Sequence, residues 1–134
     1  MADKSLQRIL YVEDEPDIQA VARIALEAVG GFELHVCNSG QEALDAAPSF
    51  DPDLILLDVM MPGMDGPSTL SALRELPALS KTPVVFMTAK VQNAEVAHYR
   101  QLGAVDVIAK PFDPMTLSTT LHGIWKTYLD EARP

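Results

Sequence analysis

Cysteine, long apolar segments and an export signal are scarce or missing in this sequence of 134 residues. The single cysteine, Cys37, excludes an internal disulfide, and its place in a strand-like run predicts a small buried thiol. No apolar run reaches the length of a membrane span, and the first residues lack a basic segment followed by an apolar core. We therefore expect a cytoplasmic protein without membrane association.

Positively charged side chains are also scarce. The chain has 10 Lys and Arg residues against 19 Asp and Glu residues, which gives a formal net charge of −9. This balance opposes contact with phosphate backbones, so direct nucleic-acid binding is not expected. It is compatible with carboxylates gathered around a divalent cation, although most of the acidic side chains are expected on solvated helix faces.

The order of the apolar runs predicts an α/β protein. Strand-like runs alternate with stretches of helical periodicity, which is typical of a five-stranded parallel sheet with helices on both faces. The predicted strands are residues 9–12, 33–37, 54–57, 84–87 and 105–109. The length fits one domain, residues 1–134 with a core of about 8–129, which buries roughly two thirds of the unfolded surface.

Prolines and glycines mark the ends of the predicted helices. Pro48 is expected to end the second helix. Asp113 and Pro114 have the form of a cap followed by a first-turn proline, which predicts the start of the last helix. The predicted helices cover residues 18–29, 41–47, 67–76, 92–102 and about 114–128.

Polar side chains follow four of the predicted strands directly. Asp58 closes one strand, and Glu13 and Asp14 follow another. Thr88 and Lys110 come directly after the last two strands. Because ligands of parallel sheets bind beyond the carboxyl ends of the strands, these side chains are the candidates for chemistry.

Three carboxylates at one edge of a sheet repel one another. A pair of like charges 4 Å apart costs about 1 kcal/mol in water and about 4 kcal/mol at an effective dielectric constant of 20. A hard divalent cation relieves this repulsion, and Mg²⁺ suits a site that offers a few carboxylates and leaves positions for water and phosphate oxygens. The sequence therefore predicts a Mg²⁺ site at Glu13, Asp14 and Asp58.

The ordered set of strand-end residues resembles the receiver domain of two-component response regulators. The resemblance extends from about residue 8 to about residue 129, and it includes the segment from Asp58 to Gly66 (Asp-Val-Met-Met-Pro-Gly-Met-Asp-Gly) and the sequence Lys110-Pro-Phe112. Any one of these pieces is common by chance, whereas all of them in order at strand ends are specific. The resemblance implies a doubly wound, flavodoxin-like fold.

The resemblance also implies roles for individual residues. Asp58 is the phosphoacceptor and becomes an aspartyl phosphate, with Lys110 and Thr88 each binding a phosphoryl oxygen. Asp58 and Asp14 ligate Mg²⁺ together with the backbone carbonyl of Met60, and Glu13 acts largely through water. The Lys110–Pro111 peptide bond is expected to be cis. Such a protein catalyses only its own phosphorylation and dephosphorylation.

The implied partners are proteins. A histidine kinase or a histidine phosphotransfer protein donates the phosphoryl group, and an unidentified downstream protein reads the phosphorylated state. A regulator of this kind acts as a free-standing switch, as a phosphate shuttle or sink in a relay, or as a receiver cut from a larger protein, and the sequence leaves these three open.

Val107 departs from the family pattern. Many receivers carry Tyr or Phe three residues before the lysine, and the ring turns inward as the threonine moves; this chain has a valine, which is expected to be buried. We therefore expect output through Thr88, the loop after it and the fourth helix.

Two other classes share the fold or the aspartyl phosphate. A flavin carrier is disfavoured, because Glu13-Asp14-Glu15 would repel the flavin phosphate. A phosphatase of the haloacid-dehalogenase type is disfavoured because Met60 stands where that family has its second aspartate.

Overall fold

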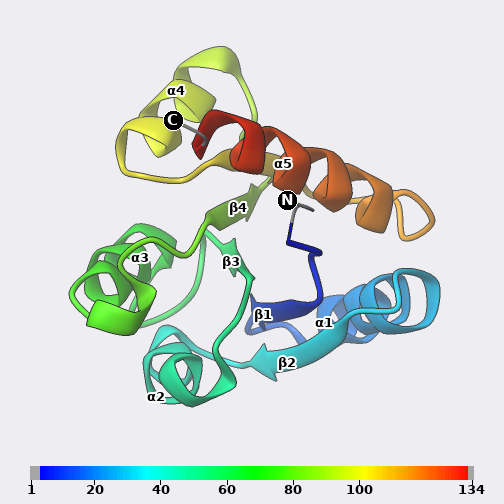
Figure 1. Ribbon diagram of the computed structural model, residues 1–134, viewed down its shortest axis with the longest axis horizontal. Coiled ribbons are helices and arrows are strands. Elements are labelled where there is room, and N and C mark those ends of the chain that lie inside the picture. The colour runs from blue at the N-terminus through cyan, green and yellow to red at the C-terminus, as the bar shows by residue number, and fades with distance from the viewer. Residues whose placement is uncertain (1–3, 133–134) are drawn as a thin grey trace.

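The protein folds around one five-stranded parallel sheet with the strand order β2-β1-β3-β4-β5 (Figure 1). The computed structural model describes residues 4–132. The strands are β1 (Arg8–Val12), β2 (Glu33–Cys37), β3 (Leu54–Asp58), β4 (Val84–Thr88) and β5 (Asp106–Ala109). This order is that of the doubly wound, flavodoxin-like folds, and the predicted fold class is confirmed.

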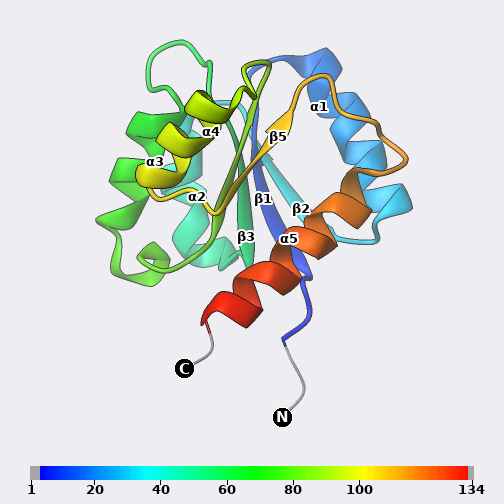
Figure 2. The same cartoon turned by 90° about the horizontal axis from the view of Figure 1, so that it is seen from above.

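Helices cover both faces of the sheet (Figure 2). One face carries α1 and α5, and the other carries α2, α3 and α4. The bounds are α1 (Pro16–Arg23), α2 (Gly40–Phe50), α3 (Gly66–Arg74), α4 (Asn93–Gln101) and α5 (Leu117–Ala132), with a π-helical turn η1 (Ile24–Val29) after α1 and a 3₁₀ turn η2 (Pro77–Leu79) after α3. Among the described residues, no helix has both the length and the hydropathy that a membrane span requires.

The three central strands are buried on both faces. Successive side chains of a strand point to opposite sides of the sheet, so each strand supplies both cores. In β3, for example, Leu54 and Leu56 pack under α1 and α5, while Ile55 and Leu57 pack under the other three helices. Cys37 lies in the second of these cores and is buried, as predicted.

Two predicted helix boundaries are wrong. Pro48 lies inside α2, which continues to Phe50 and ends where Asp51 adopts a left-handed conformation with φ 54°. The guanidinium group of Arg8, 4.5 Å from the centroid of the Phe50 ring, donates hydrogen bonds to the Phe50 carbonyl and holds this last turn. A contact with β1 thus fixes a helix end that the local rule for proline places earlier.

The last helix begins later than Asp113 and Pro114 suggest. Residues 114–116 form a turn, in which the Asp113 carboxylate accepts a hydrogen bond from the Met115 N–H (2.9 Å). The Asp113 carbonyl accepts one from the Leu117 N–H (3.0 Å), and α5 starts at Leu117. Asp113 therefore caps the turn that leads into α5.

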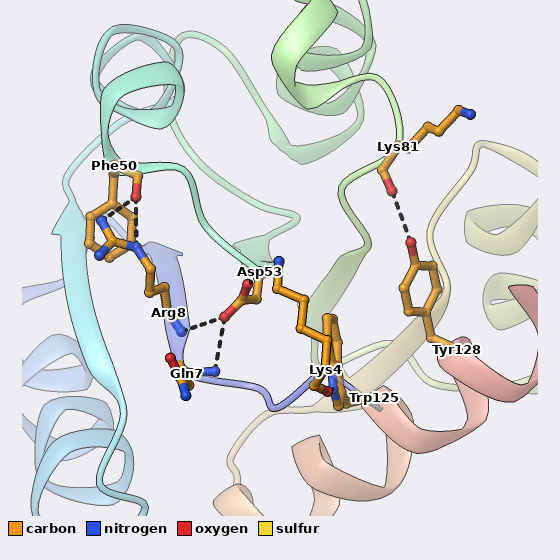
Figure 3. A network of polar contacts seen from close by, with 8 residues as sticks. All are labelled: Lys4, Gln7, Arg8, Phe50, Asp53, Lys81, Trp125 and Tyr128. Atoms are coloured by element: carbon orange, nitrogen blue, oxygen red, sulfur yellow. Dashed lines mark hydrogen bonds and ion pairs between the residues drawn. The ribbon is translucent and has the colours of Figure 1, made fainter. Parts of the chain in front are cut away.

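Asp53 joins the segment before β1 to the start of β3 at the amino ends of the strands (Figure 3). Its buried carboxylate accepts hydrogen bonds from the backbone N–H groups of Gln7 (3.0 Å) and Arg8 (2.9 Å) and forms an ion pair with Lys4 (2.9 Å). Burial raises the pKa of the Asp53 carboxyl, but the Arg8 N–H, Lys4 and the Gln7 N–H together hold it below its ordinary value of 3.8.

We predict that Asp53→Asn lowers the free energy of unfolding by about 1–3 kcal/mol near neutral pH, because two backbone donors lose a charged acceptor. A carboxyl whose pKa is depressed by folding stabilises the fold above its unfolded pKa, and this stability is lost as pH falls. The difference between the two proteins should therefore shrink below about pH 4.

Denaturant unfolding at several pH values measures this difference. Asp51→Asn is the matched control, because Asp51 is exposed and asparagine tolerates its left-handed conformation. An Asp53→Asn effect that stays constant down to about pH 2 would contradict the assignment.

Candidate functional site

The carboxyl ends of β1, β3 and β5 bring three charged side chains to one place. Residues two apart in a strand share a face, and Tyr11, Leu56 and Ile108 all contact the core under α1 and α5. Two residues further on, the three strands present Glu13, Asp58 and Lys110. Since Val12 pairs with Leu57 in parallel register, Glu13 and Asp58 are the next residues along neighbouring strands.

Glu13, Asp14 and Asp58 form a cluster in which one oxygen of each carboxylate lies within 4.8 Å of the others. The Glu13 and Asp58 side chains are buried, and Asp14 is half-buried. All three donors are hard carboxylate oxygens at a spacing that a single ion can bridge, so the donor set fits Mg²⁺. The structure thus brings together the three carboxylates that the sequence predicted.

Lys110 is the countercharge of this cluster. Its Nζ lies 3.0 Å from Glu13 Oε1 and 3.2 Å from Asp58 Oδ1. The backbone N–H of Lys110 donates to the Thr88 carbonyl (3.0 Å), which continues the pairing of β4 and β5 by one residue. The Lys110–Pro111 peptide bond is cis, as expected.

Burial controls the charge on Glu13. Burial raises the pKa of the Glu13 carboxyl to about 7. The hydrogen bond from Lys110 lowers this pKa, and the negative charge on Asp58 raises it. Glu13 and Asp58 share the single ammonium group of Lys110. Burial lowers the pKa of Lys110, but its contacts with the two carboxylates outweigh burial and raise it. A divalent cation would add the positive charge that this cluster has too little of.

Thr88 ends β4 and is buried. Its hydroxyl oxygen accepts a hydrogen bond from the backbone N–H of Lys90 (3.1 Å), so the side chain is bonded to the loop that leads to α4. This bond connects the site edge to the segment that the sequence analysis named as the route of output.

The loop after Asp58 is held close to the strand end. The Gly66 N–H donates to the Val59 carbonyl (2.9 Å), and a Cβ at Gly66 would lie 2.7 Å from the carbonyl oxygen of Asp58. Only glycine fits there, so the segment from Asp58 to Gly66 brings the chain back against the end of β3. Met60 lies two residues after Asp58 in this loop. Its N–H is 3.4 Å from Asp58 Oδ1, and the residue is 71% exposed.

Two residues differ from what the sequence suggested. Val107 is half-buried at the surface of β5, whereas a buried valine was expected. Tyr11 was treated only as part of an apolar strand, yet its hydroxyl lies 3.3 Å from Glu13 Oε1. Tyr11 in β1 and Glu13 directly after this strand are two residues apart, and that spacing was the signal that could have connected Tyr11 to the site.

Comparisons with known proteins identify the class. The chain matches the family described as the response regulator receiver domain over residues 9–122. It belongs to that family, and it is the receiver domain of a two-component response regulator. Response regulators are not classical enzymes, and their receiver domains interact with histidine kinases. Phosphorylation and Mg²⁺ binding at an acidic pocket are general properties of the family.

Individual relatives have different architectures. The DNA-binding response regulator MtrA of Mycolicibacterium smegmatis is 40% identical over 129 residues, which are 96% of this chain and 55% of that protein. The chemotaxis protein CheY4 of Vibrio cholerae has a TM-score of 0.82 at 29% identity, with 90% of this chain and 99% of that chain covered. The signal receiver domain of a histidine kinase from Syntrophus aciditrophicus has a TM-score of 0.74 at 31% identity, covering 95% and 92%. The chain spans about half the length of the MtrA proteins it matches.

We predict that Mg²⁺ affinity falls as the pH drops below about 7, because the site needs Glu13 ionised and the raised pKa of this carboxyl favours a proton there at lower pH. One displaced proton weakens binding by up to about tenfold per pH unit, and the dependence should flatten above about pH 8. Isothermal titration with MgCl₂ measures the profile. Glu13→Gln should bind more weakly with a flatter profile, and an unchanged slope in that variant would contradict the role of Glu13.

Proposed function

We propose that Asp58 accepts a phosphoryl group from a histidine kinase or a histidine phosphotransfer protein. The observation that carries this proposal is the position of Asp58: a buried carboxylate at the end of β3, 3.2 Å from Lys110 and within one cluster with Glu13 and Asp14. Phosphoryl transfer depends mainly on positioning and on countercharge, and these residues supply both.

Each residue of the site has a different role in this proposal. Asp58 attacks the phosphorus and becomes an aspartyl phosphate, while the bond to the donor histidine breaks. Mg²⁺ would be held by Asp14, Asp58 and the Met60 carbonyl, with Glu13 acting largely through water, and when bound it offsets the negative charge of the carboxylates and the phosphoryl oxygens. Lys110 moves from its carboxylate partners to a phosphoryl oxygen.

Thr88 is proposed as the switch. The Thr88 hydroxyl oxygen accepts a hydrogen bond from the Lys90 N–H, and its O–H would donate to a phosphoryl oxygen. In this proposal the side chain moves toward Asp58 to make that contact and shifts the bonded loop before α4 with it. Phosphorylation thereby shifts the population of conformations at α4, and a downstream protein reads that shift. Since Val107 has no ring that could turn inward, this route runs without the aromatic residue that many receivers use.

The proposed output is to proteins and not to DNA. The relative MtrA is named as DNA-binding, but the net charge of −9 of this chain opposes contact with phosphate backbones. Residues of about 8–129 act as one receiver domain in this proposal. A regulator, a relay shuttle or sink, and the receiver of a longer protein would all use the same site.

We predict that small phosphodonors phosphorylate the wild-type protein at one residue and only with Mg²⁺ or a similar ion present. Asp58→Asn should accept nothing, because the amide oxygen is a poor nucleophile in the position of the attacking carboxylate. Intact-mass analysis of both proteins, with and without a chelator, measures the change. Equal modification of the two proteins would refute the assignment of Asp58.

We also predict that Thr88→Ala uncouples output while phosphoryl acceptance stays largely intact. Val107→Ala should keep the response and cost about 1 kcal/mol of stability, because this side chain is only half-buried. Amide exchange of α4, with and without a phosphoryl mimic, compares the two variants. A lost response in folded Val107→Ala together with a normal one in Thr88→Ala would show that coupling runs through β5.

A further inference from the structure

Tyr11 is a fully buried tyrosine in the central strand β1. Its ring belongs to the core under α1 and α5, where a phenylalanine would fill the same space. Its hydroxyl donates to Glu13 Oε1 (3.3 Å), since a carboxylate paired with Lys110 is an acceptor only. A buried hydroxyl needs a partner, and in residues 4–132 this carboxylate is the partner that the structure gives it.

Three donors fix the Glu13 carboxylate. Oε1 accepts from Tyr11 and from Lys110 Nζ (3.0 Å), and Oε2 accepts from the Glu15 N–H (3.3 Å). Of the two side-chain donors, the lysine also contacts Asp58 and is mobile in the proposed reaction. The phenol has no second role, so it can hold Glu13 in every state of the site.

We propose that Tyr11 is a positioning residue for the metal site: its hydroxyl holds the buried Glu13 carboxylate in the orientation that faces Asp14 and Asp58. This inference rests on the proposed function, because it concerns the same Mg²⁺ site. A hydroxyl suits the task, since it adds a hydrogen-bond donor without adding positive charge that would compete with the cation.

The proposal predicts weaker Mg²⁺ binding in Tyr11→Phe, which removes the hydroxyl and keeps the ring. Loss of a hydrogen-bond partner around a metal site typically weakens metal binding by about tenfold or more. Because Glu13 acts on the ion largely through water, we expect the lower end of that range, about a tenfold rise in the Mg²⁺ dissociation constant. Isothermal titration with MgCl₂ at about pH 8 measures it. The Mg²⁺ concentration for half-maximal phosphorylation by a small phosphodonor should rise by a similar factor.

Tyr128→Phe is the matched control. The Tyr128 hydroxyl donates to the Lys81 carbonyl (3.2 Å) at the opposite end of the sheet, so the same substitution removes a tyrosine hydrogen bond far from the site (Figure 3). We expect a smaller fall in melting temperature in Tyr128→Phe than in Tyr11→Phe, because the Tyr128 bond is exposed, and an unchanged Mg²⁺ affinity in Tyr128→Phe. A purely structural role of Tyr11 would lower the melting temperature and leave Mg²⁺ affinity as it is.

The Glu13→Gln variant tests whether Tyr11 affects Mg²⁺ binding through Glu13. In Glu13→Gln, adding Tyr11→Phe should change the dissociation constant by less than about twofold, because the acceptor is already altered. A tenfold effect in both backgrounds, or none in folded Tyr11→Phe, would overturn the proposal. Wild-type protein that binds no Mg²⁺ would instead refute the proposed function itself, and the two failures are therefore distinguishable.

Discussion

The parallel sheet holds three mutually repelling carboxylates together, and this constraint is the one on which the site depends. Glu13, Asp14 and Asp58 lie within 4.8 Å of one another, and the described residues offer them Lys110 as a neighbouring cation. A cluster with more negative than positive charge persists only where the backbone fixes it, and here two buried parallel strands, β1 and β3, do so. The stability of the sheet thereby maintains an arrangement that attracts a cation.

Much of this site follows from the sequence, because strand ends are strongly marked in it. An apolar run that stops at a charged residue identifies both the strand and the edge where the charge lies, and this was sufficient for Asp58, Glu13 and Lys110. The fold class follows from the same alternation of runs. The Lys110 ion pairs follow from parallel register, which brings the ends of β1, β3 and β5 together.

The features that escaped prediction depend on contacts between distant residues. Pro48 ends a helix by local rules, but Arg8 in β1 binds the carbonyl of Phe50 and extends α2 past the proline. An apolar pattern counts Tyr11 as one more core residue and gives no information on its hydroxyl, which matters only because Glu13 is buried beside it. The exposure of Val107 likewise depends on how α4 and α5 pack against the edge strand. The local sequence around Val107 does not determine that packing.

The position of the chain ends has a consequence for how such a domain is reused. Trp125 of α5 donates to the Lys4 carbonyl (2.8 Å), and Lys4 pairs with Asp53 directly before β3, so the described chain enters and leaves at the edge opposite the carboxylates (Figure 2). A strand of five residues separates the two edges by about 16 Å. A neighbouring domain fused at either end would therefore leave the edge with the carboxylates accessible. This arrangement allows the same domain to be joined to different neighbouring domains.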